Sequence, residues 1–123
     1  MDAELHWEDE ARTVMRCTFR GDWQWKDFYA IVDQTTLFDE NPHACLIVDM
    51  RAVNRIPIDA ALHLKRAAQL ASKIEGKVIV IATSNAALTT YQLMTRVYRP
   101  LADKLCIVGS DQEAYRLLQL GTS

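Results

Sequence analysis

The sequence predicts an α/β fold with a mixed five-stranded sheet and about four helices. Short apolar runs alternate with longer segments of helical periodicity, which is typical of parallel strands covered by helices. The first two strand-like segments follow one another directly, so they predict an antiparallel hairpin at one edge of the sheet. The chain of 123 residues predicts a single domain, residues 1–123, that buries a core without disulfides.

The first half of the chain contains the hairpin, one helix and one buried strand. Residues 3–8 and 13–20 are the expected hairpin strands. In the second strand Met15, Cys17 and Phe19 share one face, and Val14, Arg16, Thr18 and Arg20 share the other, as in a half-buried strand. A helix is expected from Trp25 to about Asp39, where Asn41-Pro42 stops it, and a buried strand at residues 44–48.

The second half repeats a strand and helix unit. A helix is expected over residues 57–74, with Pro57 in its first turn and Gly76 as its C-cap. A strand at 78–82, a helix at 86–99 and a strand at 105–108 follow. Ser110-Asp111-Gln112-Glu113 has the pattern of a capping box, and it predicts a last helix that ends near Leu120.

Composition narrows the class of protein. No apolar run approaches the ~20 residues of a membrane helix, and the acidic first residues do not resemble a signal peptide, so membrane insertion is not expected. Cys17, Cys45 and Cys106 each lie in a strand-like run, which favours reduced thiols and a cytoplasmic location. No cysteine pair has the spacing of a zinc site, and no metal or other cofactor is expected.

The charges are segregated along the chain. Residues 1–50 hold 4 basic and 11 acidic residues, and residues 51–105 hold 9 basic and 3 acidic residues. If these halves form separate faces, two copies can meet as a weak homodimer that loosens as salt rises. Alternatively, the halves interleave in space and their charges cancel.

The stretch after the third strand resembles a motif of a known family. Residues 49–60 read Asp-Met-Arg-Ala-Val-Asn-Arg-Ile-Pro-Ile-Asp-Ala, against Asp-Leu-Ser-Gly-Val-x-x-Ile-Asp-Ser-Ser-Gly in the STAS family. Asp49, Val53 and Ile56 match, and the order of elements and Glu113-Ala114 are also similar. STAS domains include anti-sigma-factor antagonists and the cytoplasmic tails of sulfate transporters. The resemblance therefore implies a non-enzymatic protein-interaction or regulatory module that binds a protein partner.

Three positions of the motif depart from the family pattern. The resemblance places the phosphorylated serine of the antagonists at Asp59, the preceding serine at Ile58 and the glycine at Ala60. Phosphate at that serine disrupts the docking surface in the family by adding charge. Because Asp59 has no hydroxyl group, the resemblance implies a STAS-like member without the phosphorylation switch.

Residues 49–63 also offer candidates for a ligand site. Asp49 ends a buried strand, where it can bind a ligand at the carboxyl edge of the sheet or accept backbone N–H bonds that shape the turn. Arg51 and Arg55 precede a helix N-terminus and can bind an anion, although solvated arginines are the alternative. A small anionic or lipid-like ligand carrier or sensor is therefore the second functional hypothesis.

Asp59 and His63 are four residues apart on one predicted helix. As an enzyme site, with Asp49 nearby, the carboxylate would orient the imidazole as a general base. An exposed pair at this spacing also simply stabilises a helix by about 0.2–0.5 kcal/mol, and no nucleophile lies close by in the sequence. The sequence therefore favours a structural role for this pair.

The remaining candidates are surface residues. Trp23 and Trp25 lie at the start of the first expected helix, where one can be exposed as a contact surface or both can cover the edge of the core. Arg96 and Arg99 are expected to point outward from the helix at 86–99 and could extend a basic patch. Exposed aromatic residues do not interleave with them, so nucleic-acid binding is not expected.

Overall fold

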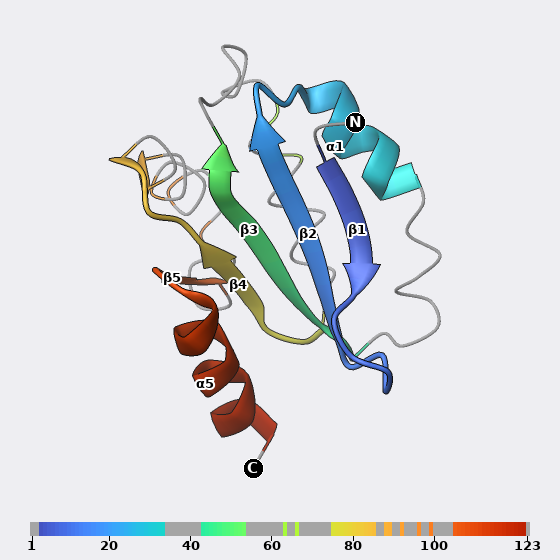
Figure 1. Cartoon of the computed structure of the whole chain (residues 1–123), viewed down its shortest axis with the longest axis vertical. Helices are drawn as coiled ribbons and strands as arrows, with labels where there is room; N and C mark the ends of the chain where they lie inside the picture. The colour runs from blue at the N-terminus through green and yellow to red at the C-terminus, as the bar shows by residue number, and fades with distance from the viewer. Residues whose placement is uncertain are drawn as a thin grey trace.

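The computed structural model describes residues 3–33, 43–53, 63, 66, 75–85, 88–89, 92, 96, 99 and 105–122. Its five strands form one mixed sheet in the order β1-β2-β3-β4-β5 (Figure 1). The strands are β1 Ala3–Trp7, β2 Val14–Gly21, β3 Cys45–Val53, β4 Val78–Ile81 and β5 Leu105–Val108. The predicted α/β class and the mixed five-stranded sheet are confirmed.

The pairing of the strands follows their connections. β1 and β2 are joined by a short turn and pair antiparallel, whereas β2, β3, β4 and β5 pair parallel to their neighbours. In the turn, the Asp9 carboxylate accepts hydrogen bonds from the backbone N–H groups of Thr13 and Val14 and from the Thr13 hydroxyl. The Asp9 side chain thus takes the place of backbone carbonyl groups as the acceptor that closes the turn.

Two helices have bounds within the described residues. α1 spans Trp25–Asp33 and α5 spans Asp111–Thr122. The Ser110 hydroxyl accepts the Glu113 backbone N–H at 3.3 Å, as the capping pattern predicts for the start of α5. The described residues within the ranges 57–74 and 86–99 are helical or, at residue 99, 3₁₀. The bounds of those two predicted helices, and the predicted continuation of α1 to Asp39, lie outside the described residues.

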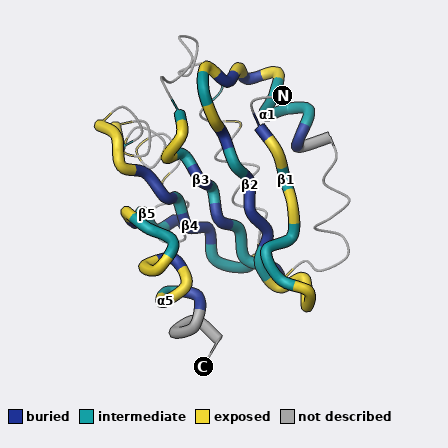
Figure 2. The backbone as a smooth tube through the Cα atoms, in the orientation of Figure 1, coloured by how far each residue is buried: buried dark blue, intermediate teal, exposed yellow. Residues whose placement is uncertain are grey.

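The two helices pack on opposite faces of the sheet. On the α1 face, the core contains Cys17, Phe19, Trp25 and Ile31 together with partly buried residues of β3. On the α5 face, Ile47, Ile79 and Ile81 pack against Ala114 and Leu118. Figure 2 shows the buried segments concentrated in the middle strands, and exposed segments in the β1–β2 turn, at the end of β3 and after β4. Neither α1 nor α5, nor any other helix seen in the described residues, has the length and apolar character needed to cross a bilayer.

β3 is longer than the sequence predicts. The strand was expected to end at Val48, but it continues to Val53 because β2 extends alongside it and Gly21 pairs with Val53. A change of register between Thr18 and Arg20 accommodates the extension. Asp49 and Arg51 therefore lie on a strand rather than in a loop, and both project to the α5 face.

Gly76 has a different role from the predicted C-cap. Its φ is not in the left-handed region, which among the described glycines is used by Gly21. A Cβ at Gly76 would lie 2.8 Å from the His43 carbonyl oxygen and would also overlap the Ala44 backbone. Glycine is therefore required here because two backbone segments approach closely, just before β4 begins.

Candidate functional site

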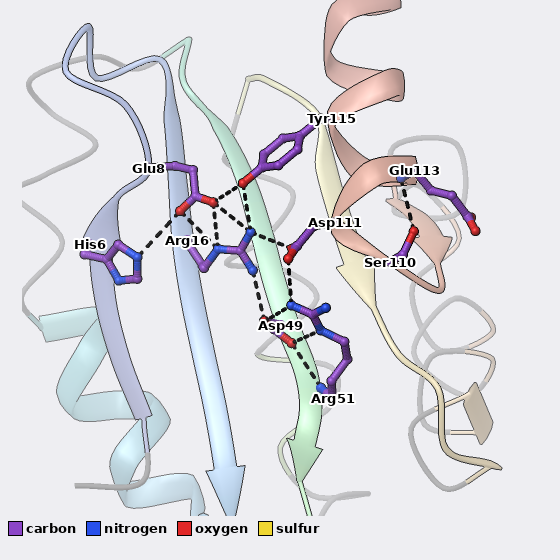
Figure 3. Close-up of polar contacts among 9 residues, drawn as sticks. All are labelled: His6, Glu8, Arg16, Asp49, Arg51, Ser110, Asp111, Glu113 and Tyr115. Carbon is purple, nitrogen blue, oxygen red and sulfur yellow. Dashed lines mark hydrogen bonds and ion pairs between the residues drawn. The ribbon is translucent and has the colours of Figure 1, made fainter.

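A buried arginine lies on the α5 face of the sheet and connects four segments of the chain (Figure 3). Arg16 is on β2, and only 7% of the residue is exposed. Its guanidinium donates hydrogen bonds to Glu8 beyond the end of β1 at 2.7–3.1 Å, to Asp49 on β3 at 2.9 Å and to Asp111 on α5 at 2.8 Å. Its Nη2 also lies 3.4 Å from the hydroxyl of Tyr115, which donates to Glu8 at 2.5 Å.

A second arginine completes the cluster. Arg51 binds Asp49 through two parallel hydrogen bonds, of 3.1 Å from Nε and 2.8 Å from Nη2. Its Nη2 also donates to the second carboxylate oxygen of Asp111 at 3.1 Å. We call these six residues the arginine network: Glu8, Arg16, Asp49, Arg51, Asp111 and Tyr115. The two-pronged geometry holds Asp49 between two guanidinium groups, an arrangement that lysine cannot reproduce.

The secondary structure explains why these side chains meet. In β3, Asp49 and Arg51 lie on the same face because side chains alternate along a strand. Parallel pairing places Arg16 opposite Ile47, two residues before Asp49 and on the same face of the sheet. α5 begins directly beyond the C-terminal end of β5, so its first turns bring Asp111 and Tyr115 to the same edge of the sheet.

The electrostatics of the network favour charged carboxylates. Hydrogen bonds from Arg16 are the largest influence on Glu8 and Asp111, and they lower the pKa of both carboxyl groups. Burial acts to raise the pKa of Asp49, but the hydrogen bonds and charges of Arg51 and Arg16 outweigh it, so that pKa is also lowered. The hydrogen bond to Glu8 raises the pKa of Tyr115 and keeps its phenol neutral.

The two arginines of the network are neutralised by its own carboxylates. Two guanidinium groups face three carboxylates, so the cluster has a net charge of −1 with Tyr115 neutral. Each carboxylate accepts hydrogen bonds from at least one arginine, which leaves little positive potential for an added anion. Within the described ranges, no group of three or more His, Cys, Asp or Glu side chains is arranged to hold a metal ion.

The predicted ligand residues are only partly brought together. The structure unites Asp49 and Arg51, and Asp49 also accepts the Arg51 backbone N–H at 3.1 Å, the turn-shaping alternative, although on a strand. Arg55, Ile58 and Asp59 lie outside the described residues, so the predicted site at 49–63 and the Asp59/His63 pair are not described as a whole.

His63 lies against α1 on the opposite face of the sheet from the network. Its Nδ1 shares a hydrogen bond of 2.6 Å with the hydroxyl of Tyr29, and its ring stacks on Trp25 with 5.0 Å between centroids. Arg66 lies over the other aromatic partner, 4.9 Å from the centroid of the Tyr29 ring. His63 therefore does not act only through the predicted pair with Asp59. It packs against α1 and hydrogen-bonds to it.

These contacts lead to a prediction for His63. The change His63→Ala removes a stacked ring and one hydrogen bond, so we expect it to lower the free energy of unfolding by about 1–2 kcal/mol. Tyr29→Phe, which keeps the ring and removes only the hydroxyl, should cost about 1 kcal/mol or less. Urea denaturation of both variants measures the difference. Equal losses in the two variants would show that the stacking on Trp25 contributes nothing.

The surface interpretation of the two tryptophans is wrong. Trp23 and Trp25 are 4% and 7% exposed, so neither supplies an exposed contact surface. They are buried because they belong to an aromatic cluster with Phe19 and Phe28 under α1, with ring centroids 4.6–5.5 Å apart. Both therefore cover the edge of the core. Arg96 and Arg99 are exposed, as expected.

Sequence reasoning missed four members of the network. The sequence pattern places Arg16 on one face of a half-buried strand, Glu8 at the end of the first strand and Asp111 in a capping box, and it gives no role to Tyr115. The available signal was a charged residue in the middle of a strand that is otherwise largely apolar. Glu8, Asp111 and Tyr115 could not be assigned to it without knowing where α5 packs.

The lowered carboxyl pKa values predict how stability depends on pH. A carboxyl group whose pKa is lower in the folded state contributes stability above its unfolded pKa of about 4, and this contribution is lost as pH falls through the folded pKa. We therefore expect the free energy of unfolding to fall steadily below about pH 4. Arg16→Leu should flatten this dependence, because Glu8 and Asp111 then lose their largest pKa-lowering partner. Denaturation curves at pH 7, 4, 3 and 2.5 measure both slopes, and equal slopes would contradict the assignment.

Comparison with known proteins assigns no family. No protein-family model matches the chain, and no curated protein matches it significantly.

Proposed function

We propose that the protein is a non-enzymatic, cytoplasmic regulatory module that binds a protein partner and resembles the STAS antagonists without their phosphorylation switch. The proposal rests on the motif at residues 49–60 and on the order of strands and helices. It also agrees with the three cysteines, none of which is in a disulfide.

The observation that carries the proposal is the fixed position of Asp49. This residue begins the family-like motif, and the network holds it through Arg16, Arg51 and its own turn-like bond to the Arg51 N–H. An anchored carboxylate of lowered pKa is poorly suited to act as a general base near neutral pH, because it has little affinity for a proton. A carboxylate that is anchored in this way suits the scaffold of a docking module better than an active site.

The same geometry weakens the two other hypotheses. An anion carrier that used Arg51 would have to displace Asp49 and Asp111, which already neutralise that guanidinium. An enzyme that used Asp49 together with His63 would need groups on opposite faces of the sheet, since Asp49 faces α5 whereas His63 contacts Tyr29 of α1. We therefore favour the interaction module over both.

Purified kinases of the anti-sigma class provide the test. We expect the chain to bind such a kinase in biolayer interferometry, and expect added Mg²⁺-ATP to leave the binding unchanged. Phosphopeptide mapping should find no phosphate in residues 56–63. Asp59→Ser, which restores a hydroxyl at the family position, should become phosphorylated and then dissociate. Failure to bind any kinase of this class, or a phosphate within 56–63 of the unaltered chain, would contradict the proposal.

A further inference from the structure

β1 is one of the two edge strands of the sheet. It pairs with β2 on one side, and no described strand pairs with its other side (Figure 1). The strand contains neither proline nor lysine, two residues that commonly protect an edge from pairing with another chain. Its exposed positions, Glu4 and His6, lie on the face that carries Arg16, because they pair with Thr18 and Arg16 of β2.

The hydrogen bonding of the hairpin shows which backbone groups of β1 point outward. The Glu8 N–H donates to the Val14 carbonyl at 2.8 Å, so Glu8 and Val14 form a hydrogen-bonded pair. Such pairs alternate with non-hydrogen-bonded pairs along an antiparallel ladder. His6 and Glu4 therefore also bond to β2. The N–H and C=O groups of Ala3, Leu5 and Trp7 therefore point away from β2. Leu5 and Trp7 are partly exposed, whereas Ala3 is buried in the single chain.

The sequence of β1 is complementary to itself. If two copies pair antiparallel about Leu5, the Leu5 residues form a hydrogen-bonded pair, and Ala3 of each copy lies opposite Trp7 of the other. The Leu5 pair forms two backbone hydrogen bonds, and the two Ala3–Trp7 pairs add about four more once the buried Ala3 is uncovered. A small side chain then lies beside a large one, and Glu4 lies opposite His6 in a non-hydrogen-bonded pair, where side chains are closest.

The acid and the imidazole are accessible for this contact. The side chains of Glu4 and His6 are 54% and 48% exposed. Within one copy Arg20 lies 3.0 Å from Glu4, and Glu8 lies 3.6 Å from His6. These neighbours hold both side chains on one face of the strand, and each Glu4 carboxylate has lone pairs left for an imidazole N–H.

We infer that the outer edge of β1 is a self-association surface, on which a second copy of this chain pairs antiparallel about Leu5 and joins the two sheets into one. The occupant is a second copy because Glu4 and His6 complement each other only when the strand meets itself in this register. In a two-fold interface each contact occurs twice, so Glu4 of each copy lies opposite His6 of the other. The contact is short, and a concentration-dependent equilibrium is therefore expected rather than a permanent dimer. This inference is independent of the proposed function.

Amide hydrogen exchange gives the first test, because the two sets of amides in β1 differ. As protein concentration rises, exchange at Leu5 and Trp7 should slow, whereas exchange at His6 and Glu8, which bond within the hairpin, should stay constant. Sedimentation equilibrium on the same samples should show a monomer and a dimer. A monomer at every concentration, or protection that rises along β5 instead of β1, would overturn the inference.

Charge exchange gives the second test and depends on the register. His6→Glu places two carboxylates opposite each other on both sides of the axis, and it should weaken the dimer by roughly tenfold. Adding Glu4→Lys restores opposite charges and should recover most of that loss. Leu5→Pro removes the central outward N–H and should abolish the dimer, with circular dichroism used to check its fold. If the double variant dimerises no better than His6→Glu alone, the pairing about Leu5 is wrong, even if Leu5→Pro fails to fold.

Discussion

Replacing Arg16 with leucine is expected to lower the free energy of unfolding by about 3 kcal/mol. Removing one partner from a buried ion pair typically costs about 3–5 kcal/mol, because the other charge stays buried without compensation. We expect the lower end of this energy range because Arg51 still pairs with Asp49 and Asp111. Glu8 is then the carboxylate that loses its arginine partner. Guanidinium chloride denaturation at pH 7 measures the loss.

Arg20 offers a matched control for this prediction. It lies on the same strand and forms an ion pair with Glu4 in which both side chains are about half exposed. Arg20→Leu should therefore cost less than about 1 kcal/mol. Similar losses in the two variants would show that the network does not stabilise the fold beyond an ordinary surface pair.

A double variant separates burial from pairing. When Glu8→Leu is combined with Arg16→Leu, both partners of the buried ion pair are removed, so Glu8 is no longer left as an unpaired carboxylate. We expect the double variant to be more stable than Arg16→Leu alone, because replacing both partners of a buried pair is far less costly than removing one. Additive losses would mean that Glu8 is well hydrated without Arg16.

The second large effect is expected at Gly76. Adding a single methyl group in Gly76→Ala places a Cβ against the backbone of His43 and Ala44, which cannot move aside as a flexible side chain can. Overpacking of this kind costs about 1–3 kcal/mol, and we expect about 2 kcal/mol or more. Thermal unfolding followed by circular dichroism would detect such a loss clearly.

Gly109→Ala is the matched control for Gly76→Ala. At Gly109 the nearest heavy atom to an added Cβ is a Glu113 carboxylate oxygen at 3.8 Å, an ordinary van der Waals distance, and the residue is exposed. This variant should change the free energy of unfolding by less than about 0.5 kcal/mol. A loss as large as that of Gly76→Ala would show that the close approach to Ala44 is not the cause.

Much of the sheet could be predicted from local patterns. Apolar runs located β4 and β5, and the alternation around Met15 and Cys17 located β2. The end of β3 could not be predicted, because residues 49–53 include Asp49 and Arg51 and their strand conformation comes from pairing with β2. Local composition describes what a segment prefers, whereas strand length also depends on a neighbour that is distant in the sequence.

The site was predictable only where its members are close in sequence. Asp49 and Arg51 were recognised together because they are two residues apart. Arg16 and Asp111 are 95 residues apart, and their contact depends on which face of the sheet α5 covers. Strand periodicity placed Arg16 on the face away from Cys17 but could not show that this face is also covered. A charge in the middle of a strand is a reason to look for a buried partner.

The arginine network also bears on folding during synthesis. Glu8 and Arg16 leave the ribosome well before their partners Asp111 and Tyr115. During synthesis the N-terminal part of a chain can fold before the C-terminal part is available. A nascent chain can pair β1 with β2 and then β3, yet the Arg16 guanidinium stays hydrated on one side until α5 arrives. We therefore expect the final step of folding to be the docking of the last helix, with a native-like sheet already formed and its charged flank still open to water.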